Sequence, residues 1–157
     1  MHTSTLPCPR ILNYKPPRIA FALLIIASAL NIVFGSIALD LAASLPAAAI
    51  VGASGFLLML RAWWLFKQAN TAICPTAQTS TLLTNDVYAW TRNPMYLGIV
   101  LMLLAVALIT GSVFHYVAAI LFFAIIDHSF CPYEEEKMRA NFATRFPAYA
   151  RRVRRWF

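Results

Sequence analysis

The sequence predicts an all-α integral membrane protein with four transmembrane helices and a C-terminal amphipathic helical arm. Its 157 residues are 61% hydrophobic and only 12% charged. Soluble domains are nearer half apolar and a quarter charged. The apolar blocks also have the length of about 20 residues that a helix needs to cross a bilayer. At this chain length we expect a single domain over residues 1–157.

The four spans are predicted at residues 19–39, 46–66, 95–110 and 112–130. The first block is longer than the apolar core of a signal peptide, so we expect it to be retained as a span. Residues 95–126 contain no charged side chain and are too many for one span. We therefore divide this run at Thr110-Gly111-Ser112.

The charge pattern predicts the orientation in the membrane. The net charge is +7, and all thirteen Lys and Arg residues lie before the first span, around the loop between the second and third, or after the fourth. The positive-inside rule then places both termini on the cytoplasmic side. Attraction to anionic lipid explains this charge without a nucleic-acid partner.

Neither a disulfide framework nor a metal site is predicted. The three cysteines are odd in number, form no CxxC pair and would face the reducing cytoplasm. The three histidines are scattered along the chain and add no metal-binding pattern. These residues are Cys8, Cys74, Cys131, His2, His115 and His128.

The tail, residues 131–157, has helical periodicity. Apolar residues recur at spacings of three and four and form one stripe, with arginines opposite. We expect Pro147 to divide this tail into two short helices. Anchoring in the membrane interface would by itself account for the stripe. Its members are Met138, Phe142, Phe146, Tyr149, Val153 and Trp156.

Two polar segments are expected at the same membrane face: Tyr88–Tyr96 and Glu134-Glu135-Glu136. Each has a simple structural explanation. Arg92 could anchor the interface, Pro94 could begin a helix, and a glutamate in a first helical turn gains roughly 0.3–1 kcal/mol from the helix dipole. Together, however, the two segments supply a cation, an amide, phenols and carboxylates. Such a set suits a zwitterionic ligand at the mouth of a helical bundle.

The same segments resemble a known family. Residues 81–98 read TLLTNDVYAWTRNPMYLG, similar to the cofactor segment of isoprenylcysteine carboxyl methyltransferases, which ends in RHPxYxG. Residues 134–156 read EEEKMRANFATRFPAYARRVRRW, similar to that family's EExxLxxxFGxxYxxYxxxVxR. Phospholipid N-methyltransferases share much of both patterns.

The resemblance implies that S-adenosylmethionine binds between a cofactor loop, residues 78–98, and the tail. Matching positions imply that Leu82, Leu83 and Tyr88 border the adenosine. Residues 93–96 would line the cofactor cavity, and Glu134 and Glu135 would hold polar groups of the cofactor. Arg92 would clamp the methionyl carboxylate or organise the loop. The cofactor-binding residues are thus Leu82, Leu83, Tyr88, Arg92, Asn93, Pro94, Met95, Tyr96, Glu134 and Glu135.

Among the departures of this chain from the family patterns, four matter for function. Asn93 replaces the usual histidine, Ala143 a tail glycine, and Asp86 the glycine before the Val-Tyr pair. Phe130 stands where eukaryotic prenylcysteine enzymes have an arginine suited to a substrate carboxylate. This last difference argues against a prenylcysteine substrate.

The resulting hypothesis is a methyltransferase that acts on a lipophilic or membrane-associated acceptor reaching the site from the bilayer. One alternative is a phospholipid headgroup N-methyltransferase, and another is a non-catalytic membrane binding or scaffold protein. Asp127 and His128 are candidates for a general base by position, although a role at a helix end accounts for them better. The catalytic residue, the acceptor group and the oligomeric state stay open.

Overall fold

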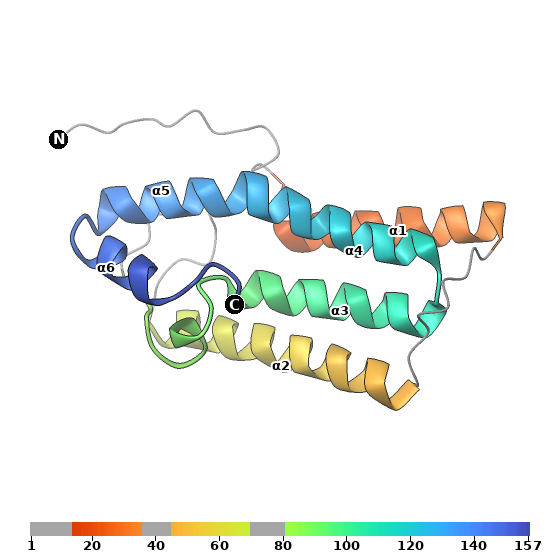
Figure 1. Ribbon diagram of the computed structural model, residues 1–157, viewed down its shortest axis with the longest axis horizontal. Coiled ribbons are helices and arrows are strands. Elements are labelled where there is room, and N and C mark those ends of the chain that lie inside the picture. The colour runs from red at the N-terminus through yellow and green to blue at the C-terminus, as the bar shows by residue number, and fades with distance from the viewer. Residues whose placement is uncertain (1–13, 36–44, 70–80) are drawn as a thin grey trace.

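The computed structural model describes residues 14–35, 45–69 and 81–157, and these form helices joined by short connections. Figure 1 shows α2, α3 and α4 running along the long axis, with α6 and the C-terminus at the end where α3 begins. Within the described ranges there is no β-strand. The helices are α1 (Pro16–Phe34), α2 (Leu45–Gln68), the 3₁₀ turn η2 (Asp86–Ala89), α3 (Pro94–Thr110), α4 (Val113–Ile125), the π turn η3 (Ile126–Phe130), α5 (Cys131–Asn141) and α6 (Arg145–Arg152).

Three helices of the described chain have the length and apolar composition to cross a membrane: Pro16–Phe34, Leu45–Gln68 and Val113–Asn141. Helix α3 is also apolar but has only 17 residues. Large apolar side chains on the outer surfaces, such as Ile32 and Ile50, are more than half exposed. Such surfaces suit a lipid environment, and the protein is an all-helical integral membrane protein. The four-span arrangement stays a prediction.

The predicted spans differ from the helices mainly at their ends. Helix α1 begins at Pro16 and ends at Phe34, and residues 36–39 of its predicted span lie outside the described residues. Helices α2 and α3 begin one residue before the predicted 46–66 and 95–110, and α2 extends to Gln68. Their boundaries therefore follow the apolar pattern closely.

The helix continues past residue 130, where the fourth predicted span ends, because α4, η3 and α5 form one helix of 29 residues. The π turn η3 lies directly before Pro132. In a regular α-helix a proline ring meets the carbonyl group four residues earlier, and a π turn alters that spacing. The acidic residues therefore continue the fourth apolar helix instead of starting a separate one.

The tail contains the two helices α5 and α6, and the chain leaves helical geometry at Phe142. Pro147 lies in the first turn of α6, where the N–H that it lacks would have no helical partner. Phe146, Tyr149 and Val153 are buried together with Leu82. The apolar stripe of the tail thus packs against the loop, and this contact accounts for it without membrane insertion.

Helices α2 and α3 approach each other closely at two glycines. A Cβ atom on Gly55 would lie 2.6 Å from the carbonyl oxygen of Gly98, and one on Gly98 would lie 2.5 Å from that of Gly55. The contact is therefore between backbones, as is common where small residues line membrane helix interfaces. It fixes the position of α3, whose first turn contributes to the site described below.

We expect Gly55→Ala to destabilise the protein, because the new methyl group has no space without a shift of backbone. Overpacking of this kind costs about 1–3 kcal/mol. Thermal unfolding in detergent, followed by circular dichroism, would measure the loss. Ala53→Leu is the control, since Ala53 lies on the exposed face of the same helix. Equal melting temperatures for Gly55→Ala and the unaltered protein would contradict the close contact.

Candidate functional site

A cavity of about 400 Å³ lies where α2 ends and α3 begins. Its wall combines the beginning of α1, the end of α2, the loop before α3, and α5 with α6. All ten residues that the sequence predicts as cofactor-binding line this one cavity. Their contact with a cofactor stays a prediction, but the two sequence motifs do converge.

The loop is bent at Asp86, which has a φ of 59°. This is the left-handed region that favours glycine, the usual residue of the family pattern here. The Asp86 carboxylate accepts hydrogen bonds from its neighbour Val87 N–H (2.8 Å) and from Arg61 (2.6 Å). The bond from Arg61 lowers the pKa of Asp86, so that the carboxylate stays ionised. These contacts join the loop to α2.

A second contact joins the loop to α6. The Tyr149 hydroxyl donates a hydrogen bond of 2.6 Å to the backbone carbonyl of Tyr88. Both side chains are buried and line the cavity. Burial raises the pKa of Tyr149 to about 12, which keeps the phenol protonated and able to donate.

The first two glutamates of α5 have different partners. The Tyr96 hydroxyl donates a hydrogen bond of 2.5 Å to Oε1 of Glu134. Glu135 instead faces arginines from three segments. Its Oε1 lies 3.0 Å from Arg92 and 2.8 Å from Arg155, and its Oε2 lies 3.7 Å from Arg139.

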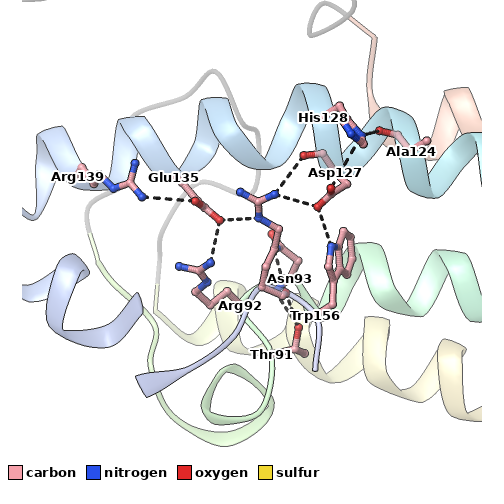
Figure 2. A network of polar contacts seen from close by, with 10 residues as sticks. Thr91, Arg92, Asn93, Ala124, Asp127, His128, Glu135, Arg139 and Trp156 are labelled. Atoms are coloured by element: carbon pink, nitrogen blue, oxygen red, sulfur yellow. Dashed lines mark hydrogen bonds and ion pairs between the residues drawn. The ribbon is translucent and has the colours of Figure 1, made fainter. Parts of the chain in front are cut away.

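These contacts divide the roles of the acidic residues. The side chains of Arg92 and Glu135 are only 14% and 12% exposed, so their ion pair is largely buried. Charges buried to this extent need partners, and Glu135 has them within the protein. Figure 2 shows Glu135 between the arginines. Glu134 lies outside this network and lines the cavity, whereas Glu136 is exposed and does not line it.

A protein-family model matches most of the chain. The model of the family described as phospholipid methyltransferase matches residues 43–145, which is more than half of the chain. The chain belongs to the phospholipid methyltransferase family. The match runs from before α2 into α6 and includes the loop, Glu134 and Glu135. No curated protein and no solved structure matches the chain. Membership indicates a membrane methyltransferase.

Asn93, where the resembled pattern has histidine, uses its amide to bind the C-terminal segment. It is the N-cap residue of α3, yet its side chain does not cap the helix. Its Nδ2 donates a hydrogen bond of 3.2 Å to the backbone carbonyl of Arg155. Pro94 is the first helical residue and also lines the cavity. Pro94 therefore begins the helix, as its simple explanation predicts, and its contact with a cofactor stays a prediction.

Thr91 and Arg155 belong to the polar network, and the sequence predicted no role for either. Buried Thr91 donates a hydrogen bond of 2.9 Å to the carbonyl of Arg155. The Asp127 carboxylate accepts hydrogen bonds from Arg155 (2.9 Å) and from the Trp156 indole (2.8 Å). These partners are distant in sequence, and no local pattern indicates them.

The two predicted base candidates do not line the cavity. Asp127 is occupied by Arg155 and Trp156, and the His128 ring is hydrogen-bonded to the Ala124 carbonyl at 2.9 Å. The role at a helix end that the sequence favoured is not observed, because both residues lie inside the continuous helix Val113–Asn141. In the part of the chain that the structure describes, no three His, Cys, Asp or Glu side chains could together hold a metal ion. Cys8, Cys74 and His2 lie outside the described residues.

We expect Tyr149→Phe to destabilise the protein by about 1–3 kcal/mol, since the buried Tyr88 carbonyl loses its donor. The effect should depend on pH. The folded protein raises the pKa of Tyr149 from 10 to about 12, so this phenol stabilises the fold fully below pH 10 and loses that contribution between pH 10 and 12. Unfolding free energies of both proteins, measured by denaturant titration at pH 8 to 12, would show the difference shrinking over that window. A difference that is constant across it would contradict the prediction.

Proposed function

We propose that this protein is an S-adenosylmethionine-dependent methyltransferase that acts on a lipophilic or membrane-associated acceptor. The observation that supports the proposal most strongly is the meeting of two separate motifs, around Arg92 and Glu134, at one cavity. Its volume of about 400 Å³ lies within the usual range for small-molecule sites, about 300–1,000 Å³. The family match supports methyl transfer independently.

The wall of the cavity has the donors and acceptors that this cofactor requires. The cofactor has a cationic sulfonium, an amino group, a carboxylate and an adenosine. In the proposed arrangement Glu134 meets the protonated amino group, Arg92 lies toward the carboxylate, and Leu82, Leu83 and Tyr88 border the adenosine. When bound, the cofactor supplies an electrophilic methyl group for in-line displacement. The protein's main contribution is alignment, which can supply roughly 7–11 kcal/mol.

The acceptor is proposed to reach the cavity from the bilayer. Met59 and Phe66 of α2, Pro16 of α1 and Ile99 of α3 form an apolar part of its wall. The outer surfaces of α1 and α2 expose large apolar side chains suited to lipid. The cofactor would enter from the cytoplasm, in a four-span topology with both termini on that side.

A phospholipid amine is the second candidate for the acceptor. The family description names phospholipids, and Phe130 is fully buried where an arginine would suit an acceptor carboxylate. An amine must lose its proton to be methylated, so this reaction would benefit from a base. The catalytic residue is left open.

Titration calorimetry with S-adenosylhomocysteine tests cofactor binding. We expect the unaltered protein to bind and Glu134→Gln to bind about 10- to 100-fold more weakly, because a hydrogen bond to a charged group is lost. Glu136→Gln is the matched control, since Glu136 is adjacent but exposed. An absence of binding heat in the unaltered protein would refute the cofactor and favour the scaffold alternative.

The acceptor can be identified with cofactor labelled in its methyl group. Purified protein in nanodiscs is incubated with this cofactor and a membrane extract, and the products are analysed by mass spectrometry. We expect label in the lipid fraction, and in phospholipid headgroups if the second candidate is correct. Glu134→Gln at low cofactor concentration should reduce the labelling. Label found only in water-soluble products would contradict a lipophilic acceptor.

A further inference from the structure

The last residues of the chain cross the site as an extended segment, here called the strap, Val153–Trp156. Helix α6 ends at Arg152, and Val153 has extended geometry with φ −116° and ψ 128°. Val153 is buried, and the Trp156 ring packs on Phe123 with a centroid distance of 4.8 Å. The strap is therefore packed against the protein at both ends.

Three consecutive loop residues donate hydrogen bonds to the backbone of the strap. The Arg92 N–H bonds to the carbonyl of Arg154 at 3.1 Å. The Thr91 hydroxyl and the Asn93 amide bond to the carbonyl of Arg155 at 2.9 and 3.2 Å. Figure 2 shows Thr91, Asn93 and Trp156 close together beneath the helix that carries Asp127 and Glu135. Arg92 and Asn93 line the cavity, so the strap contacts the site from behind.

The Arg155 side chain joins two carboxylates of the long helix. Its Nε donates to Glu135 at 2.8 Å, and its terminal N–H donates to Asp127 at 2.9 Å. Two residues eight positions apart in a regular α-helix lie roughly 80° apart around its axis. The π turn η3 begins just before Asp127 and has more residues per turn, which brings these two carboxylates nearer to one face.

Arg155 thereby affects how strongly Glu135 attracts Arg92. Arg92 and Arg155 bond to the same oxygen of Glu135, and Arg139 lies farther away with a side chain that is 59% exposed. Without Arg155, Glu135 would depend mainly on Arg92 to balance its charge. Of its two donors from the strap, Asp127 would keep only Trp156. The guanidinium of Arg92 would then be drawn toward Glu135 and away from a ligand.

We infer that Arg155 is a positioning residue, which acts through Glu135 and the loop backbone to hold Arg92 and Asn93 in the geometry that binds the cofactor. Arg155 itself does not line the cavity. The inference rests on the proposed function, because it assigns the strap to the cofactor site. The family match ends at residue 145, so the strap lies outside it.

The test compares Arg155→Gln with Arg154→Gln in full-length protein in nanodiscs. Arg154 is the exposed neighbour, and its contact with the loop uses only its backbone. We expect Arg155→Gln to weaken S-adenosylhomocysteine binding about tenfold and to raise the KM for S-adenosylmethionine with kcat nearly unchanged. Arg154→Gln should match the unaltered protein. Arg155→Lys should rescue little, since an ammonium cannot reproduce the planar fork between two carboxylates.

Asp127→Asn provides a second, nearly isosteric variant that keeps the bond between Arg155 and Glu135. It should weaken binding less than Arg155→Gln, and the double variant should bind no more weakly than Arg155→Gln alone. If Arg155→Gln does not fold, Asp127→Asn decides: unchanged affinity overturns the inference.

Two outcomes separate this inference from the proposed function. If the unaltered protein binds and Arg155→Gln binds equally well, the inference is overturned and the proposed function stands. If the unaltered protein does not bind S-adenosylhomocysteine at all, the proposed function fails and the inference fails with it. A loss of affinity that merely follows a loss of folded protein in circular dichroism also overturns the positioning role.

Discussion

The site depends on one largely buried carboxylate, Glu135, that is shared among arginines from separate parts of the chain. Arg92 belongs to the loop before α3, Arg139 to the same helix as Glu135, and Arg155 to the C-terminal strap. A buried charge is tolerated only with close partners. Meeting this requirement draws the loop, the long helix and the strap together, and the cavity lies where they meet.

Glu134 and Glu135 are adjacent but have different roles, because their side chains contact different residues. Glu135 balances arginines within the protein, whereas Glu134 accepts a hydrogen bond from Tyr96 at the cavity wall. One carboxylate therefore holds the loop, and the other lies at the wall of the cavity. In the proposed methyltransferase, this division would let a cationic cofactor bind without disturbing the ion pairs that shape the site.

The helical bundle gives these contacts a firm support. The backbone contact between Gly55 and Gly98 fixes α3 against α2, and α3 carries Tyr96 in its first turn. The π turn before Pro132 keeps the fourth apolar helix continuous with the acidic segment. The glycine contact and the π turn thus determine where the polar side chains lie at the cavity end of the bundle.

The sequence by itself determined the helical membrane character, three of the helix positions and the two motifs that meet at the cavity. It could do so because apolar runs and helix-starting prolines are local patterns, and because the motifs resemble a known family. Only the tertiary structure decided that the long helix continues past residue 130 and that Glu135, unlike Glu134, is bound by arginines. Likewise, nothing near Arg155 in the sequence identifies Asp127, Thr91 or Asn93 as its partners. Those contacts join residues 28 to 64 positions apart, and packing alone brings such residues together.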